Sequence, residues 1–439
     1  MTHFSAFLKR LLLCLLLLVL ILPAVQTRFP IFKMGSLGGY TERASRPDFN
    51  WPSLFDNSYQ PALEKYVEDR IGFRELLIRL RNQLAYSFFS VVKAHKILLG
   101  DDHIALDENF IRGYLGQDFK GESEVRANVR KFKAVQDTLA RRGILLVFAI
   151  APNKTYFYAE KQPAYFRQQP HLKSNYTAYA QEMHRKGVNL VDLAQIFQQW
   201  KDTASYPLFP HGGVHWSGYG ITLAADTLFR YIEQRGRFDL PDHAAVSRTI
   251  TNEPSGTDND AAKTMNLIWE PTAFEMAYPD IKFELPKPNQ QKPNMLIVGD
   301  SFVWSLIGFY PYIQNLFSDK TQFWYYNTQV QYGTRDDMSP GREVALLDRK
   351  AEILAQDVVL ILVNQYNLGS FDNGFTTNAY DLLCSYTTTD LSRIQTIEQE
   401  LKQSTAVQDT LWKQAHATNR DYNQLLHEMA IEQYELRHP

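Results

Sequence analysis

The stretch Met295-Leu-Ile-Val-Gly-Asp-Ser301-Phe302 determines the fold that we expect for this chain. Its first four residues are apolar and predict a buried strand, which Gly299 ends. A helical stretch from about residue 302 to 316 follows, and Pro311 is able to kink or interrupt it. Ser301 therefore lies on a turn between a strand and a helix. In open α/β sheets such turns, at the carboxyl ends of the strands, are where ligands bind.

Ser301 has two interpretations at this turn. The nearby start of a helix offers backbone N–H groups that can stabilise an oxyanion, so Ser301 is a candidate nucleophile. A serine before a helix is also an ordinary N-cap with a purely structural role. A second motif upstream favours the nucleophile.

That second motif is His215-Trp216-Ser217, which follows a glycine-rich loop and precedes a helix expected from residue 218. A serine nucleophile needs a base that takes its proton and returns it to the leaving group. Both motifs lie in loops between sheet and helix, and a parallel sheet brings such loops to one rim. We therefore expect Ser301 Oγ within hydrogen-bond reach of a ring nitrogen of His215, or one water away, with Trp216 beside the site. His211 is a second candidate base, ranked lower because two glycines follow it instead of a helix.

The remaining pattern predicts an α/β fold with a doubly wound parallel sheet. Apolar runs at 144–150, 295–298 and 357–363 are expected to be parallel strands of one sheet, joined by shorter strands at 189–193 and 322–326. The expected helices span 127–142, 176–186, 218–234 and 343–355. The segment 236–293 shows no regular pattern and is expected to be irregular.

The N-terminus carries a membrane or export signal. Lys9 and Arg10 precede a charge-free apolar run from residue 11 to 25, and Arg28 closes it. The run is short for a spanning helix and long for a signal-peptide core. No clear cleavage site follows, so an uncleaved signal anchor is favoured over a cleaved signal. Either interpretation places the bulk of the chain outside the cytoplasm.

We divide the chain into four parts. Residues 1–28 are the anchor, 29–95 a linker and helical lead-in that packs on the main domain, 96–385 the α/β domain, and 386–439 a helical C-terminal extension. The net charge of -2 over 439 residues argues against a nucleic-acid binder. Only two cysteines occur, and no metal-binding pattern is present.

The order of motifs resembles a known family. It runs from Asp69-Arg70-Ile-Gly-Phe-Arg74 through Pro152-Asn-Lys154 and His215-Trp-Ser217 to Gly299-Asp-Ser-Phe302. This order is similar to the AlgX/AlgJ-type polysaccharide O-acetyltransferases, which have an SGNH-hydrolase-like domain, and the resemblance covers roughly residues 60 to 370. It implies that Ser301 is the nucleophile and His215 the base.

The resemblance leaves the acid of the triad open. In that family an acid stands two residues before the histidine, where this chain has Gly213. Either another carboxylate serves, with Asp258 and Asp260 the nearest polar candidates, or the site is a dyad, or its activity has decayed. A triad without its acid loses control of the tautomer and orientation of the base.

The resemblance also implies a reaction. Ser301 would accept an acetyl group from a membrane-bound O-acyltransferase partner and pass it to a hydroxyl of a polysaccharide, at the periplasmic face of the inner membrane or in the periplasm. It implies no metal and no organic cofactor. Oxyanion donors would be the backbone N–H of Ser301 or Phe302 and the side chain of Asn364, although Asn364 suits turn capping equally well. Two alternatives remain: a carbohydrate esterase on the same scaffold, and a non-catalytic polysaccharide-binding or assembly protein, which Gly213 suggests.

Overall fold

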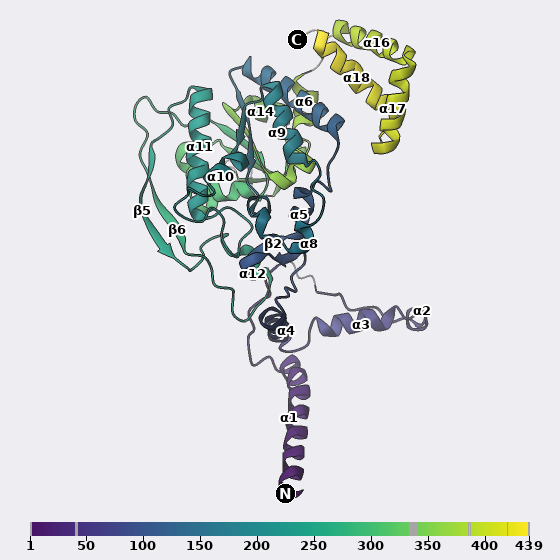
Figure 1. The fold of residues 1–439 in the computed structure, drawn as a ribbon, viewed down its shortest axis with the longest axis vertical. Helices are drawn as coiled ribbons and strands as arrows, with labels where there is room; N and C mark the ends of the chain where they lie inside the picture. The colour runs from purple at the N-terminus through teal and green to yellow at the C-terminus, as the bar shows by residue number, and fades with distance from the viewer. Residues whose placement is uncertain are drawn as a thin grey trace.

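The computed structural model describes residues 2–39, 43–332, 341–384, 386, 388–418 and 420–437. Its main body is a sheet covered by helices on both faces, with α1 below it and three C-terminal helices beside it (Figure 1). The strands are β1 (Ile97–Leu99), β2 (Ala105–Asp107), β3 (Leu145–Ala151), β4 (Leu190–Asp192), β5 (His243–Thr251), β6 (Met276–Phe283), β7 (Met295–Gly299), β8 (Gln322–Tyr325), β9 (Gln329–Tyr332), β10 (Arg342–Glu343) and β11 (Val358–Asn364). The helices of the main body are α5 (Glu108–Tyr114), α6 (Glu122–Ala140), α7 (Lys154–Phe157), α8 (Ala164–Arg167), α9 (Asn175–Lys186), α10 (Leu193–Trp200), α11 (Gly218–Gly236), α12 (Asp260–Thr264), α13 (Tyr312–Leu316), α14 (Arg349–Leu354) and α15 (Phe375–Leu383).

The central sheet has the strand order β10-β9-β8-β7-β11-β3-β4. Strands β8, β7, β11, β3 and β4 are parallel to their neighbours, and β9 and β10 add an antiparallel edge. The register pairs Leu360 of β11 with Val147 of β3 on one side and with Ile297 of β7 on the other. The three apolar runs are therefore adjacent parallel strands, and this prediction is confirmed.

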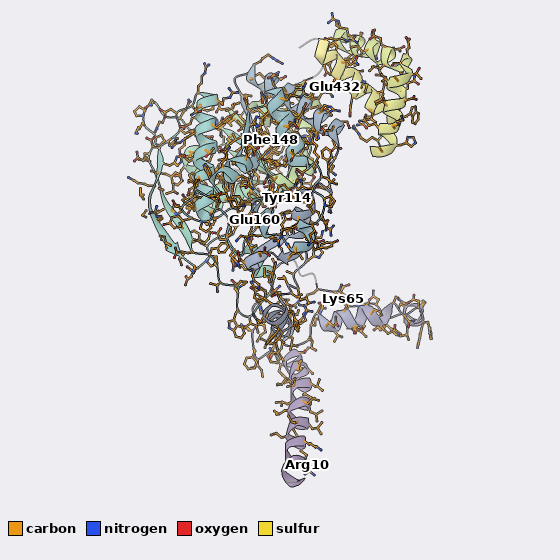
Figure 2. All side chains as sticks on the ribbon, in the orientation of Figure 1. Arg10, Lys65, Tyr114, Phe148, Glu160 and Glu432 are labelled. Carbon is orange, nitrogen blue, oxygen red and sulfur yellow. The ribbon has the colours of Figure 1, made fainter. Side chains whose placement is uncertain are left out.

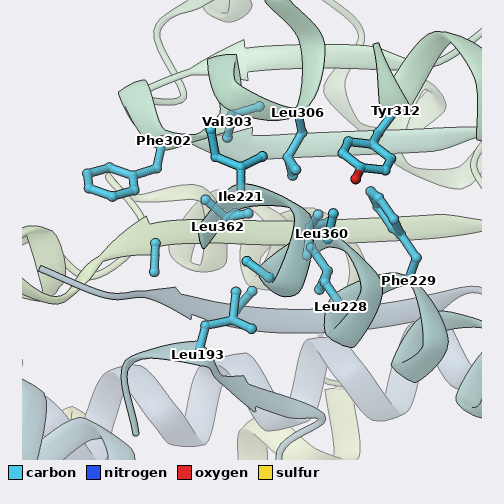
Figure 3. Packing of buried hydrophobic residues seen from close by; sticks show 14 of the residues in the cluster. Leu193, Ile221, Leu228, Phe229, Phe302, Val303, Leu306, Tyr312, Leu360 and Leu362 are labelled. Atoms are coloured by element: carbon cyan, nitrogen blue, oxygen red, sulfur yellow. The ribbon is translucent and has the colours of Figure 1, made fainter. Parts of the chain in front are cut away.

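Each central strand is buried on both faces. In β3, Val147 and Ala149 belong to the core under α10 and α11, whereas Phe148 and Ile150 belong to the core under α6, α9 and α15. Figure 3 shows the first core, where Leu360 lies among side chains of α11 and of the segment after β7. The alternation follows from the period of two along a strand, and two covered faces explain why the strands read as continuous apolar runs. The predicted doubly wound α/β fold is confirmed.

The segment after Ser301 differs from the single helix that the sequence suggested. A 3₁₀ turn spans Ser301–Val303, a π-helical turn spans Ser305–Phe309, and α13 begins only after Pro311. Proline lacks an N–H and fixes its own φ, so it starts a new helix instead of continuing the old one. The helix expected at 343–355 is likewise reduced to a 3₁₀ turn at Val344–Leu346 and to α14.

The expectation that residues 236–293 are irregular was wrong. Strands β5 and β6 pair antiparallel across most of their length, with a register shift near Ala245. Side chains along β5 are mostly exposed, so the strand lacks the apolar alternation by which strands are recognised. The short helix α12 also lies in this segment and contributes to the site described below.

The chain outside the main body is helical. Helix α1 (Thr2–Arg28) contains a stretch from Lys9 to Arg28 that is long and apolar enough to cross a membrane. It is followed by α2 (Trp51–Phe55), α3 (Tyr59–Glu68) and α4 (Arg74–Phe89). At the other end, α16 (Thr388–Gln403), α17 (Thr405–Thr418) and α18 (Tyr422–Arg437) share a small core of their own. Figure 2 shows Phe148 inside the main body, whereas Arg10 and Lys65 lie on helices that stand clear of it.

Candidate active site

The site lies where the parallel strands end. Ser301 follows β7, Asn364 ends β11, and Asn153 and Lys154 follow β3. The register places these ends side by side, because β11 is paired with both β7 and β3. Polar side chains that the sequence separates by up to about two hundred residues are thereby brought to one edge of the sheet.

Ser301, His215 and Asp260 form a continuous hydrogen-bonded chain. Ser301 Oγ lies 2.8 Å from Nε2 of His215, and Nδ1 of the same ring lies 2.5 Å from Oδ2 of Asp260. The expected proximity of Ser301 and His215 is therefore confirmed. Nδ1 donates to the carboxylate in this arrangement, which leaves Nε2 free to accept the serine proton. The order nucleophile, base and acid is that of a serine hydrolase triad.

The loop before His215 is held in place by its own backbone groups. Nζ of Lys154 donates to the carbonyls of His211 and Gly213, at 2.8 and 2.7 Å. Oδ1 of Asp260 accepts from the N–H of Val214 at 2.9 Å, on the carboxyl group whose other oxygen contacts His215. The acid therefore positions the base twice, through the ring and through the backbone that precedes it.

Gly213 has no room for a side chain. A Cβ built there would lie 2.6 Å from the carbonyl oxygen of Thr257 and 2.9 Å from the carbonyl carbon of Asp258. The loop that carries Asp258 and Asp260 thus packs directly on the backbone of Gly213. In the resembled family this position holds the acid. Here the glycine allows two backbone segments to lie in close contact, and Asp260, which contacts the histidine, belongs to the second of these segments.

Asp300 ties the serine turn to the neighbouring strand. It is fully buried and accepts three hydrogen bonds: from the N–H of Phe302 at 3.0 Å, from the N–H of Asn364 at 2.7 Å and from Nδ2 of Asn367 at 2.6 Å. Burial raises the pKa of its carboxyl group, while the donors oppose that rise. This arrangement fixes the backbone on which Ser301 stands.

Two of the expected oxyanion donors are already engaged. The N–H of Phe302 donates to Asp300, as described above. The side chain of Asn364 is buried, donates to the carbonyl of Pro152 at 3.0 Å and accepts from Nδ2 of Asn153 at 2.7 Å. Oδ1 of Asn364 also accepts from the N–H of Tyr366 at 3.1 Å, which is the turn capping that the sequence left open as its alternative role. Among the described residues we find no acceptor for the Ser301 N–H.

Three further expected site residues lie away from the reacting atoms. Trp216 is completely buried and packs edge-on against Phe302, so it supports the site from below and presents no face to a substrate. His211 is buried and its Nε2 lies 2.9 Å from the carbonyl of Asp102, which excludes it as the base in this arrangement. Asp258 contacts the hydroxyl of Tyr278 at 2.9 Å and makes no hydrogen bond to His215.

Two buried groups beside the triad have displaced pKa values. Burial lowers the pKa of Lys154 to about 7, although Asp260 and Asp258 oppose that change. Burial also raises the pKa of Asp258 to about 7, opposed by the hydrogen bond from Tyr278. Oδ1 of Asp258 has no hydrogen-bond partner among the described residues, which is consistent with a group that is costly to ionise. The charge balance next to His215 is therefore sensitive to pH near neutrality.

Sequence reasoning did not single out Asp300, Asn367 or Lys154 as parts of the site. Each lies in or just after a strand end, and both Asp300 and Lys154 belong to motifs that the sequence displays. The sequence feature that could have identified them is their position as polar residues directly after buried apolar strands. Their partners could not be named, because the contacts join positions far apart in the chain.

Part of the chain, which includes the three residues of the hydrogen-bonded chain, matches a model of a known protein family. Residues 110–324 match a family model described as an SGNH hydrolase-like domain, acetyltransferase AlgX. This segment, just under half of the chain, is similar to the AlgX-type SGNH hydrolase-like domains that the model describes. Ser301, His215 and Asp260 all lie within it, and the resemblance inferred from the motifs is confirmed.

The SGNH-like chain is also similar to two curated relatives, each named "Probable alginate O-acetylase AlgJ". It is 25% identical over 221 residues to that of Pseudomonas aeruginosa, which covers 49% of this chain and 52% of the relative. It is 25% identical over 201 residues to that of Azotobacter vinelandii, covering 45% and 49%. The chain thus spans about half the length of the curated relatives it matches.

Solved structures of similar arrangement include the O-acetyltransferase domain of Pseudomonas putida AlgJ and Pseudomonas aeruginosa AlgX. The first has a TM-score of 0.42 and 17% identity, covering 65% of this chain and 98% of the other. The second has a TM-score of 0.43 and 13% identity, covering 69% and 72%.

We predict that Gly213→Asp will not rebuild an acid in the SGNH-like site. The new side chain has to displace the backbone of Thr257 and Asp258. The variant should therefore lose about 1–3 kcal/mol of stability and most of its activity. Denaturant unfolding and an acetyl-ester assay measure the two effects. Gly308→Asp is the matched control, because a Cβ at Gly308 meets nothing within 4 Å. Higher activity in Gly213→Asp would contradict the assignment of Asp260.

We predict that Asp258 makes stability fall as pH rises. Its pKa is 3.8 in the unfolded chain and about 7 in the folded one, so between these values the folded state binds more protons. Asp258→Asn removes that linkage and should gain stability relative to the wild type from about pH 4 to pH 7. Unfolding midpoints of both proteins across this range measure the difference. Parallel profiles would show that Asp258 ionises freely in the folded protein.

Proposed function

We propose that this chain is an extracytoplasmic O-acetyltransferase that acetylates hydroxyls of an exported polysaccharide through an acetyl-Ser301 intermediate. The single observation that supports it most is the chain of contacts from Ser301 through His215 to Asp260, located at the rim of an AlgX-type domain. The curated relatives are named as probable alginate O-acetylases, so alginate or a related uronic acid polymer is the first substrate to test.

The first half-reaction would transfer acetyl to the serine. Nε2 of His215 removes the proton from Ser301 Oγ while that oxygen attacks the carbonyl carbon of the donor. The new Oγ–C bond forms, the bond from the carbonyl carbon to the donor's leaving atom breaks, and the imidazolium gives its proton to that atom. Asp260 stabilises the imidazolium and holds Nδ1 protonated.

The second half-reaction would run in reverse on another substrate. The sugar hydroxyl gives its proton to Nε2 as its oxygen attacks the acetyl carbon, and Ser301 Oγ leaves and recovers the proton from His215. Because the N–H of Phe302 is engaged by Asp300, the backbone N–H of Ser301 is the donor that we assign to the oxyanion. No step requires a metal or an organic cofactor.

The setting of the reaction follows from the N-terminus. The stretch Lys9–Arg28 would anchor the protein in the inner membrane, with the SGNH-like domain on the periplasmic side. Acyl donors that are made in the cytoplasm have to cross that membrane, so we propose a membrane-bound O-acyltransferase as the partner that supplies acetyl. An anchor keeps Ser301 close to such a partner.

The contact of Asp260 with His215 removes the main reason to treat this chain as a non-catalytic protein, which was the glycine at position 213. An esterase would use the same groups with water as the acceptor. Incubation with an acetyl ester and the polysaccharide separates the two: a transferase forms acetylated polymer faster than free acetate, and an esterase does the opposite.

We predict that Asp260→Asn and Ser301→Ala each abolish most acetyl transfer. The Asp-to-Asn change in a serine protease triad costs about 10⁴-fold in rate, because the histidine adopts the wrong tautomer. Mass spectrometry should detect acetyl on Ser301 of the wild type, and Ser301→Ala should acquire none. Asp258→Asn is the matched control and should retain most of the activity. Equal losses in Asp258→Asn and Asp260→Asn, with folding intact, would remove Asp260 from the proposed role.

A further inference from the structure

Helix α4 buries polar residues against the main body and exposes apolar residues, which is the reverse of the usual arrangement. Asn82 and Gln83 are the buried residues, at 4% and 8% exposure, and they contact the main body: Nδ2 of Asn82 donates to the carbonyl of Met265, and Oε1 of Gln83 accepts from two backbone N–H groups. Tyr86 also packs against the main body, but a row of other apolar residues lies on the opposite side of the helix and is exposed. They are Leu76, Leu77, Leu80, Leu84 and Phe88. Their spacing of three and four residues places them on one side of the helix.

This reversal extends over the whole segment between α1 and the main body. Of the large apolar side chains that are exposed among the described residues, fifteen lie between residues 29 and 91 and only ten beyond residue 91. The most exposed side chains of this segment include those of Phe55 and Phe88, at 78% and 74% exposure. Residues from α2, α3 and α4 also line an apolar groove of about 930 Å³, among them Leu54, Leu63, Val67 and Leu77. Exposed apolar surface of this extent is unusual on a protein surrounded by water.

The segment joins the end of α1 directly. The N–H of Gly72, in the turn between α3 and α4, donates to Oγ1 of Thr27 at 2.7 Å, and a Cβ at Gly72 would lie 2.4 Å from the carbonyl oxygen of Pro23. Figure 1 shows α3 running crosswise to α1, with α4 seen nearly end-on just beyond the end of α1. Both helices therefore run across the direction in which α1 would span a bilayer, at the level where α1 would leave it.

The composition matches the boundary between lipid and water. Exposed Phe49 and Phe55 each pack against exposed Trp51 at the start of α2, and aromatic side chains are favoured at that boundary. Arg81 lines the groove beside the leucines, where its charge suits lipid phosphates. Arg74 also lines the groove but pairs with Asp69 at 2.8 Å, and Glu64 and Glu68 lie along the same groove. A helix with a broad apolar face and basic residues at its border typically lies in the membrane surface.

We propose that α2, α3 and α4, residues 51–89, form an arm that lies in the outer surface of the inner membrane and inserts its apolar face among the lipids. The proposal rests on the anchoring of α1 that is part of the proposed function. With α1 it gives the protein two attachments to the bilayer. The second attachment fixes the height and orientation of the main body, because Asn82 and Gln83 bind the loop that follows α12. The distance of Ser301 from the membrane is then set by the arm.

The experiment uses the full chain in vesicles of phosphatidylethanolamine and phosphatidylglycerol. A fluorophore that responds to polarity is attached to one cysteine at a time. Native Cys14, in α1, is labelled in a Cys384→Ser protein and reports on the span. In a protein that carries Cys14→Ser and Cys384→Ser, the label is placed through Phe55→Cys, Phe88→Cys or, as the matched control, Leu285→Cys. Leu285 is 89% exposed and lies on the main body after β6.

The probes at positions 14, 55 and 88 should shift to shorter wavelengths and lose most of their emission when the lipids carry brominated acyl chains, and the probe at position 285 should do neither. Quenching at position 14 but not at positions 55 and 88 would overturn the arm and leave the anchor intact. Absence of quenching at position 14 would overturn the anchor and the arm together. A shift to shorter wavelengths at positions 55 and 88 that needs an added membrane-bound acyltransferase and is not accompanied by quenching from the brominated lipids would assign the face to a protein and overturn the lipid proposal.

Discussion

The hydrogen bond between Asp260 Oδ2 and His215 Nδ1 is the interaction on which the proposed chemistry depends. It orients the imidazole so that Nε2 faces Ser301, and it would stabilise the positive charge that the ring acquires during the reaction. The acid is the first residue of α12, forty-five residues beyond the histidine, so its position is determined by the packing of two separate segments. That packing requires the backbone at Gly213 to approach the backbone of Thr257 and Asp258 closely.

The sheet and the buried charges provide the support for that contact. Lys154 is buried at the end of β3 and uses its ammonium group to hold two carbonyls of the loop before His215. Asp300 is buried at the end of β7 and holds the serine turn against β11. Burying such groups is costly unless they are hydrogen-bonded, and both make good contacts. The free-energy cost of burying these groups is consistent with a site whose geometry is fixed before any substrate binds.

Much of the fold could be predicted from the sequence, because it depends on local patterns. The strands from 145, 295 and 358 are continuous apolar runs, and such runs indicate burial on both faces of a sheet. The pairing of Ser301 with His215 could also be predicted, because strand ends of a parallel sheet share one rim. The hairpin of β5 and β6 could not, because its exposed strands carry no apolar alternation. The choice of Asp260 over Asp258 depended on loop packing, which no local pattern encodes. For the same reason the sequence left Asn364 open between an oxyanion donor and a turn cap, and its side chain is buried, donates to the carbonyl of Pro152 and caps the turn that follows β11.

The most direct test of the account is to detect the proton on Nδ1 of His215 by nuclear magnetic resonance. A proton shared with a carboxylate over 2.5 Å should resonate far downfield of ordinary imidazole N–H protons. The account predicts that this resonance is present in the wild type and in Asp258→Asn, and that it disappears or moves strongly upfield in Asp260→Asn. A downfield resonance that survives in Asp260→Asn but is lost in Asp258→Asn would show that the histidine is oriented by the other carboxylate, and would contradict the central claim.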